Sequence, residues 1–531
     1  MIARNSLLVL LNTLVGAILG FVALKFIALY MGVRTVGQLD FALGLVAIMS
    51  VVTDLGFNQA HVKRVSEGME VEEALSFYIW FKLLTTLGFI ALGIGLVAYA
   101  IFIQRQVLED STAATLAFLL AFQTLKGVQT VGVQTFDGRR EIAKTQLSLL
   151  AENITRVGLS LAFALLYGGS VLGVGPFKGV TLPATLSNWL RSDPSATLAV
   201  AAVFGALVSV AFVISFLVRY KIQFRRPTKE TWASYWRFAR PIFFLYVVTL
   251  VAAQLDKVIV GFFGRDVDVG LLGGATRIAQ LVTMASGALG VVLFPFISDL
   301  HARKDEKGLR KAVHLAVRYN SMVLFPVSLF IVLFSGPILQ IILAGSFSPA
   351  QRMLSILAAS ALVHGIVIPI GTILVAMDHP EVASRIGVVI SASNIVAMLI
   401  LVPAQTPLYS GFGLKGEGAA IALLFSNLLS LGLVLFYLQR LWTLNILREM
   451  PMHLLAALAS NTVGFSLFGY YFSYSPSIGT PLLLGLALLV IGLYLGLLYL
   501  LREFRKEDMS FFTDLISPSK LTDHVRRDLR R

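Results

Sequence analysis

Charged side chains interrupt several long apolar runs of this sequence, and they are the residues whose types and depths could do chemistry. A charge inside a bilayer is costly, so such residues are functional candidates by default. The apolar runs contain six basic residues, namely Lys25, Lys82, Lys126, Arg156, Lys257 and Arg277. They contain three acidic residues, Asp54, Glu152 and Asp256, and a fourth, Asp40, lies near an outer end. Because cations outnumber acids, the chemistry indicated is binding of an anion such as phosphate or pyrophosphate.

The depths of these cations predict a ladder of positive charge across the bilayer. Lys82 falls in the inner third of its run, Lys126 and Arg156 fall near the middle, and the other three lie in the outer half. If all six faced one cavity, an anionic group could cross while remaining paired. The three acids would then serve ion coupling or pair the cations at rest.

Several pairings offer structural alternatives to a role in binding. Glu152 and Arg156 are four residues apart on one predicted helix, a spacing at which opposite charges pair. Asp256 has the same alternative with Arg277 or with another helix. Lys25 and Lys257 lie near outer ends and can instead extend to the membrane surface.

Motifs for enzymatic chemistry are sparse. The sequence has no G-x-x-x-x-G-K-[ST] or H-E-x-x-H motif, and no cysteine for a thiolate metal site or a nucleophile. The only histidine deep in an apolar run, His364, is typical of a core residue. Asp266 and Asp268 form a D-x-D, the kind of pair that holds a metal–sugar phosphate in membrane glycosyltransferases, so that class stays open as an alternative. Otherwise we expect no enzyme, no metal and no cofactor.

The elements that carry these charges are predicted membrane helices. Of 531 residues, 57% are hydrophobic and 14% are charged, whereas charged residues make up roughly 25% of soluble domains. Hydropathy predicts about fourteen spans, near 6–30, 37–60, 74–103, 112–136, 145–167, 197–218, 241–263, 270–297, 317–344, 353–377, 384–402, 418–438, 453–474 and 480–501. The predicted fold class is an all-α polytopic membrane protein.

The net charge of +14 sits mainly in short loops that flank the apolar runs. This distribution is a topology signal and does not indicate nucleic acid as a partner. Because the basic loops fall on one side, the positive-inside rule predicts that both termini are cytoplasmic.

The first twelve spans are predicted to form two repeats. Matching strings recur at equivalent places, namely Val36-Gly37-Gln38-Leu39 with Val269-Gly270-Leu271-Leu272, and Asp137, Glu141 and Asn153 with Asp378, Glu381 and Asn394. Six spans per repeat insert the same way up, which predicts a pseudo-two-fold axis along the membrane normal. The predicted domains are an N-lobe (1–220), a basic amphipathic linker (221–240), a C-lobe (241–440), and two further spans with a basic cytoplasmic tail (441–531).

A basic segment at residues 219–240 separates the two predicted lobes. Thr228 or Thr231 can cap a new short helix there. Three aromatic residues share one face of that helix: Trp232, Tyr235 and Trp236. Amphipathic segments of this kind lie at a cytoplasmic membrane surface, and the alternative is a solvated linker helix.

Short motifs spread over roughly residues 1–440 carry a family resemblance. They are Met31-Gly32-Val33 with Val36-Gly37, Asp54-Leu55-Gly56-Phe57, the stretch from Ala252 to Gly270 with Gln254, Asp256, Lys257 and Gly264, and the loop Arg139-Arg140-Glu141-Ile142-Ala143-Lys144. Together they resemble the polysaccharide (Wzx-like) flippases of the multidrug/oligosaccharidyl-lipid/polysaccharide exporter superfamily. The resemblance implies two six-helix lobes, alternating access, and movement of a polyprenyl-linked oligosaccharide from the cytoplasmic to the outer leaflet.

Two departures leave the glycan class open. Family members often have an arginine just before the Leu-Gly that ends the first span, where this chain has Leu29, with Lys25 one turn earlier. The two additional C-terminal spans are reminiscent of the lipid II flippases of the same superfamily.

The sequence therefore predicts a flippase of lipid-linked oligosaccharide in a prokaryotic cytoplasmic membrane. In this prediction Arg156, Lys126 and Lys82 hold the phosphate from inside, while Lys25, Lys257 and Arg277 receive it outside. The alternative in another functional class is a cation-coupled multidrug exporter, which would need acidic and aromatic groups in its cavity. The expected partners are the lipid-linked oligosaccharide, the bilayer, H+ or Na+, and a polysaccharide polymerase or glycosyltransferases.

Overall fold

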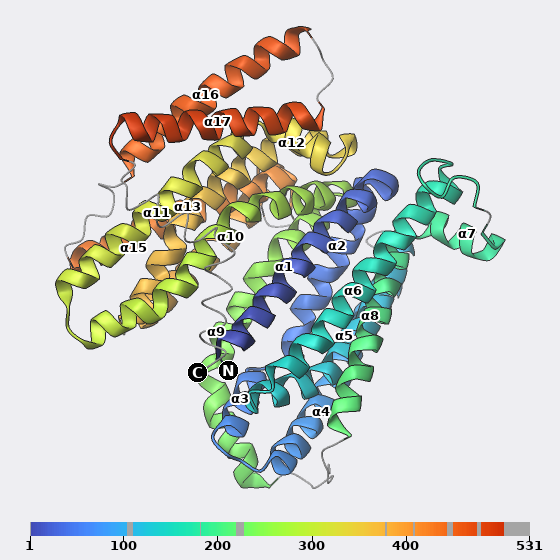
Figure 1. Ribbon diagram of the computed structural model, residues 1–531. Coiled ribbons are helices and arrows are strands. Elements are labelled where there is room, and N and C mark those ends of the chain that lie inside the picture. The colour runs from blue at the N-terminus through green and yellow to red at the C-terminus, as the bar shows by residue number, and fades with distance from the viewer. Residues whose placement is uncertain are drawn as a thin grey trace. The chain divides into compact units, whose positions relative to one another are not determined.

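The computed structural model describes residues 2–102, 110–180, 182–218, 228–377, 380–406, 409–442, 450–474 and 479–503, which are mostly helical (Figure 1). Eleven segments among them are long and apolar enough to cross a membrane. One of these, Val15–Thr53, covers most of the first predicted span and most of the second. The spans predicted at 241–263 and 270–297 fall on two further long helices. The prediction of an all-α polytopic membrane protein is confirmed.

The chain divides into two compact units, whose described parts lie within Met1–Gly270 and Leu271–Leu521. The first unit contains α1 (Ile2–Phe26), the π-helical turn η1 (Ile27–Met31), α2 (Gly32–Met49), the 3-10 turn η2 (Ser50–Thr53), α3 (Phe57–Ser66), α4 (Val71–Phe102), α5 (Asp110–Gly138), α6 (Ile142–Leu166), the π-helical turn η3 (Tyr167–Val171), α7 (Ala184–Ser192), α8 (Pro194–Leu217), α9 (Lys229–Phe263) and the first turn of α10 (Asp266–Ala302). Helix α8 packs along both α5 and α6, and α1 packs against α6.

The second unit continues α10 and adds α11 (Glu306–Leu333), α12 (Ser335–Ile342), the 3-10 segment η4 (Gly345–Ala350), α13 (Gln351–Ala376), α14 (Pro380–Leu401), α15 (Lys415–Trp442), α16 (Pro451–Tyr474) and α17 (Thr480–Leu500). Helix α13 packs against α11 and α15, and α15 packs against α14. The last two helices pack against each other, and α16 also packs on α11.

The repeat motifs fall at comparable places in the two units. Asn153 lies in the middle of α6, which follows a short turn after α5, and Asn394 lies in the middle of α14, which follows α13. Asp378, the predicted counterpart of Asp137, lies outside the described residues. The pseudo-two-fold relation between the lobes and the predicted domain boundaries stay predictions.

Two glycines that the repeats match, Gly37 and Gly270, pack against each other inside the first unit. A Cβ added to Gly37 would lie 1.7 Å from the carbonyl oxygen of Asp266, and one added to Gly270 would lie 2.1 Å from that of Val33. Gly37 thus packs on Asp266, one helical turn before Gly270, and Gly270 packs on Val33, one helical turn before Gly37. Because any side chain would hold the two backbones apart, α2 and the first turn of α10 depend on glycine at both positions.

The second predicted span does not run straight to residue 60, as the sequence had suggested. Helix α2 ends at Met49, and the chain turns through Leu55 and Gly56, whose φ angles are 47° and 80°. The Asp54 carboxylate then accepts a hydrogen bond from the Asn58 N–H at 3.0 Å, which satisfies a free donor at the start of α3.

The described part of the basic segment begins a long helix. Residues 219–227 lie outside the described residues. The Thr228 hydroxyl accepts the Thr231 N–H at 3.1 Å, so the predicted cap is confirmed. The predicted short length is wrong, because the helix continues into the next membrane segment and α9 has 35 residues.

The aromatic face of this segment packs inside the first unit. Tyr235 is fully buried, and its ring lies 4.2 Å from that of Phe77 on α4. The Trp232 ring meets the same phenylalanine edge-on at 5.0 Å. Tyr235 and Trp232 therefore pack α9 against α4, while Trp236 is 50% exposed. The membrane-surface role of the segment stays a prediction.

Candidate anion-binding cavity

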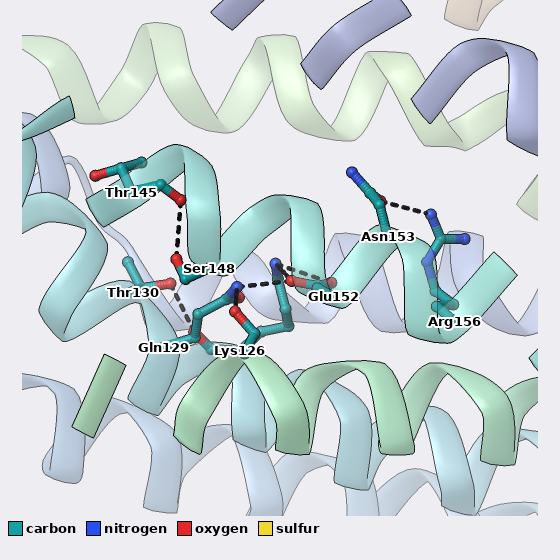
Figure 2. A network of polar contacts seen from close by, with 9 residues as sticks. Lys126, Gln129, Thr130, Thr145, Ser148, Glu152, Asn153 and Arg156 are labelled. Carbon is teal, nitrogen blue, oxygen red and sulfur yellow. Dashed lines mark hydrogen bonds and ion pairs between the residues drawn. The ribbon is translucent and has the colours of Figure 1, made fainter. Parts of the chain in front are cut away.

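Helices α5 and α6 bring Lys126 and Glu152 together inside the first unit. Lys126 Nζ lies 3.0 Å from Glu152 Oε2 and 3.3 Å from Oε1. Figure 2 shows Lys126 and Gln129 converging on this carboxylate from α5. The Glu152 side chain is 8% exposed and that of Lys126 is 28% exposed. The Lys126 side chain is therefore partly exposed, while the Glu152 side chain is largely enclosed.

A second contact holds the Glu152 carboxylate in place. Gln129 Nε2 donates to Glu152 Oε2 at 2.6 Å and also to the Ser209 hydroxyl on α8. Helix α8 comes this close because of Gly205, where an added Cβ would lie 2.9 Å from the Glu152 carbonyl oxygen. The tight packing of α5, α6 and α8 thus fixes the orientation of the carboxylate.

Arg156 lies one turn further along α6 and has a neutral partner. Its guanidinium donates to Asn153 Oδ1 at 3.1 Å, as Figure 2 shows. Among the described residues Arg156 forms no ion pair, and Glu152 pairs with Lys126 instead. The expected i, i+4 pairing of Glu152 with Arg156 is therefore wrong, because Lys126 on the neighbouring helix binds the carboxylate.

These charged groups line a cavity of about 340 Å³ between α1, α5 and α6. Its lining residues are Asn12, Thr13, Gly16, Lys126, Leu149, Glu152, Asn153 and Arg156. Helix α1 contributes only uncharged groups, and Asn12 Nδ2 donates to Gln146 Oε1 on α6 at 2.8 Å. With two cations and one carboxylate, the cavity carries one positive charge in excess. In a site partly shielded from water, this charge favours an anionic ligand.

The other four candidate cations are not among the lining residues of this cavity. Lys82 is 4% exposed and donates to the Thr53 carbonyl oxygen at 2.7 Å. Lys25 is exposed on α1, and Lys257 Nζ donates to Gln254 Oε1 at 3.3 Å on α9. Arg277 lies on α10 in the second unit. The first unit therefore assembles two of the six cations, Lys126 and Arg156, in one cavity.

The remaining acids also have local contacts. Asp54 caps α3 as described, Asp40 is buried on α2, and Asp256 Oδ1 accepts the Lys257 N–H at 2.8 Å. The D-x-D pair forms the first turn of α10. There Asp268 Oδ2 accepts the Arg265 N–H at 2.9 Å, and Asp266 lies 4.0 Å from Arg34.

Uncharged residues also line the cavity or hold its carboxylate, and charge alone does not identify them. Asn12, Gln129 and Ser209 carry no charge, so only their polarity within apolar helices marks them. Asn153 had a stronger signal, because it belongs to the motif that recurs around Asn394.

Comparisons with known proteins give two relatives that are named as probable flippases. The chain is 23% identical over 426 residues to the probable low-salt glycan biosynthesis flippase Agl15 of Haloferax volcanii, covering 80% of this chain and 81% of that protein. It is also 28% identical over 238 residues to the probable flippase AglR of the same organism, covering 44% of this chain and 48% of that protein.

Two solved structures have the same fold. The lipid II flippase MurJ, in an inward closed conformation, aligns with a TM-score of 0.68 at 16% identity, covering 96% of this chain and 99% of that one. An inward-facing multidrug resistance MATE family transporter of the MOP superfamily aligns with a TM-score of 0.60 at 13% identity, covering 81% of this chain and 96% of that one.

Family models support the resemblance noted in the sequence. The MatE model matches residues 241–400. The model described as polysaccharide biosynthesis protein matches residues 2–301, which is more than half of the chain. The chain therefore belongs to the polysaccharide biosynthesis protein family.

Proposed function

We propose that this protein is a flippase that moves a polyprenyl-(pyro)phosphate-linked oligosaccharide from the inner to the outer leaflet. The observation that carries the proposal is Arg156, a guanidinium on the cavity wall whose hydrogen-bond partner is a neutral amide. Such a group is available to pair with a phosphate, and guanidinium–phosphate hydrogen bonds are strong and directional. The flippases among the relatives support the same substrate class.

Lys126 gives the second contact to the phosphate. At rest its charge is balanced by Glu152 at 3.0 Å. An incoming phosphate competes with that carboxylate, so full engagement of Lys126 requires Glu152 to move away or to be neutralised. Neutralisation by H+, or by Na+ bound to the carboxylate, would couple substrate binding to an ion.

Transport then follows from alternating exposure of the cavity to the two membrane faces. We place the protein in the cytoplasmic membrane with both termini inside, as the basic loops predict. Lys25, Lys257 and Arg277 are proposed to receive the phosphate during release. The protein performs no bond-breaking chemistry in this proposal, and a polymerase or glycosyltransferases supply or use its substrate.

The test compares arginine variants in cells depleted of the native protein. Arg156→Gln is expected to abolish surface glycan while its membrane abundance stays normal, and Arg156→Lys retains part of the flux because the charge remains. Arg303→Gln is the matched control, since that side chain is 72% exposed and pairs with Asp299. Normal surface glycan with Arg156→Gln would remove Arg156 from the mechanism.

A cation-coupled multidrug exporter is the second candidate, and the fold shared with a MATE transporter favours it. A cationic drug would meet like charge at Lys126 and Arg156, whereas an exporter of cations needs an acidic cavity. Efflux of a cationic dye that persists in Lys126→Gln and Arg156→Gln would support the exporter. A membrane glycosyltransferase would instead lose activity when Asp266 and Asp268 are replaced.

A further inference from the structure

The connection between α6 and α8 exposes apolar side chains where the chain leaves the membrane. Candidate spans end at Val171 and resume at Pro194, so the residues between them start and finish at a membrane boundary. Every residue from Leu172 to Val180, here called the glycine loop, is exposed. Its four large apolar side chains are between 40% and 48% exposed: Leu172, Val174, Phe177 and Val180.

Backbone turns and glycines give the glycine loop a fixed shape. The Val174 N–H donates to the Gly168 carbonyl oxygen at 2.9 Å, and the Val180 N–H donates to that of Phe177 at 3.2 Å. Gly173, Gly175 and Gly179 have φ angles of 69°, 87° and 86°, which favour glycine. The outward direction of the apolar side chains is therefore built into the loop.

The glycine loop is also attached to the top of the first span. A Cβ added to Gly175 would lie 2.7 Å from the Tyr30 hydroxyl oxygen, and one added to Gly168 would lie 2.7 Å from the Tyr30 ring. The loop therefore rests on η1, whose residues belong to the span Val15–Thr53. This contact keeps the loop beside η1, which lies between α1 and α2, and the loop itself follows the end of the candidate span Ile142–Val171.

The neighbouring helix α7 differs, because its apolar face is covered by protein. Leu190 is fully buried, and the Trp189 ring lies 6.5 Å from the Phe118 ring on α5. The apolar side chains of the glycine loop have no comparable cover among the described residues. The glycine loop directly follows a candidate membrane span, whose surface contacts lipid. The bilayer is therefore the partner that can cover the apolar side chains of the loop as well.

We propose that the glycine loop inserts into the headgroup region of the leaflet at this end of the first unit. Apolar side chains at this depth contact the acyl boundary, and Lys178 lies among them with an exposed ammonium group. The partner is therefore a phospholipid surface, with anionic headgroups near Lys178. The loop anchors α1, η1 and α6 to that leaflet independently of what the cavity transports.

Because the native sequence has no cysteine, single-cysteine spin labels can test the depth of the loop in the full chain. Labels at Val174→Cys and Phe177→Cys are placed in nanodiscs, and their collision rates with oxygen and with an aqueous nickel chelate are measured. The lipid reference is Leu207→Cys, exposed within α8, and the water reference is Glu67→Cys after α3. The proposal predicts oxygen-to-nickel ratios that lie between the two references and clearly above the water reference. Ratios equal to the water reference at both positions would overturn it.

A second comparison tests the headgroup contact. Nanodiscs of phosphatidylglycerol are expected to bury the Phe177→Cys label more deeply than those of phosphatidylcholine, and Lys178→Gln should remove the difference. Equal depth in both lipids would overturn the assignment of anionic headgroups to Lys178. Label positions that fold poorly would be recognised by a lowered melting temperature, and Val180→Cys then replaces them.

Discussion

Lys126 Nζ lies 3.0 Å from Glu152 Oε2 on the wall of a cavity that Arg156 also lines. The two helices thus supply both a cation for the substrate and an anion that competes with it. In the resting protein this pair compensates the charge of Lys126 within the membrane, while Arg156 keeps its positive charge. Binding of a phosphate must therefore exchange one anion for another, and this exchange gives the first prediction.

Glu152→Gln is expected to bind phosphate more tightly and to transport less. Removing a negative charge at 3.0 Å frees Lys126, so the affinity for methyl phosphate at pH 7 should rise by about tenfold or more. Glycan flux should fall, because the resting pair can no longer re-form and displace the phosphate. Calorimetric titration of the purified variant measures the affinity, and surface glycan measures the flux.

Glu381→Gln is the control for that change, since the Glu381 side chain is 85% exposed. It should alter neither quantity. Unchanged methyl phosphate affinity in Glu152→Gln would show that Glu152 does not compete with the phosphate for Lys126.

Lys82→Met is expected to weaken the fold without changing anion binding. Lys82 is buried and donates to the Thr53 carbonyl oxygen at 2.7 Å, next to the turn at Leu55 and Gly56. Loss of that donor should lower the free energy of unfolding by about 1–3 kcal/mol. Thermal unfolding followed by tryptophan fluorescence measures this cost. A drop in methyl phosphate affinity with an unchanged melting temperature would instead place Lys82 on the anion pathway.

The protein is expected to lose stability as the pH falls below about 6.5, because of His61 on α3. Burial, with a smaller contribution from the charge of Lys82, lowers the pKa of His61 from 6.5 to about 3. The folded protein thus keeps His61 neutral, between the Tyr235 hydroxyl at 3.0 Å and the Thr135 hydroxyl at 2.9 Å. The unfolded chain binds a proton below pH 6.5, so the free energy of unfolding should decrease by up to about 1.4 kcal/mol per pH unit towards pH 3.

Denaturant unfolding of wild type and His61→Gln between pH 7 and 4.5 tests this assignment. The variant is less stable at pH 7 but should show a shallower decline as the pH falls. Parallel declines in the two proteins would mean that other groups cause the acid sensitivity.

Gly37→Ala is expected to destabilise the junction between α2 and the first turn of α10. The added Cβ would lie 1.7 Å from the Asp266 carbonyl oxygen, so the two backbones must separate, at a cost of about 1–3 kcal/mol. Gly20→Ala in α1 is the matched control, because nothing lies within 4 Å of its added Cβ. That control should be neutral or slightly stabilising, and equal melting temperatures for the two variants would contradict the close packing.

The fold was largely predictable because long apolar runs in the sequence indicate membrane helices. The interruption at Leu55 and Gly56 was not, since hydropathy gives only the approximate extent of a span and does not report a change of backbone direction. The packing of Tyr235 was also missed. An amphipathic aromatic face fits a membrane surface and a protein groove equally well, and only the position of α4 decides between them.

The candidate site was predictable in part for a similar reason. A charge in an apolar run identified Lys126, Glu152 and Arg156, because only a specific role or partner offsets its cost. The predicted pairing of Glu152 with Arg156 was wrong, because the i, i+4 spacing considers α6 alone and Lys126 on the neighbouring α5 binds the carboxylate. Lys82 has the right depth in sequence, but depth does not tell which way a side chain points.

The measurement that tests the central claim most directly is the leaflet distribution of lipid-linked oligosaccharide in cells depleted of this protein. The flippase proposal predicts a build-up confined to the cytoplasmic leaflet, which wild type reverses and Arg156→Gln does not. An unchanged distribution on depletion, with an altered tolerance to cationic dyes, would contradict it and favour the multidrug exporter.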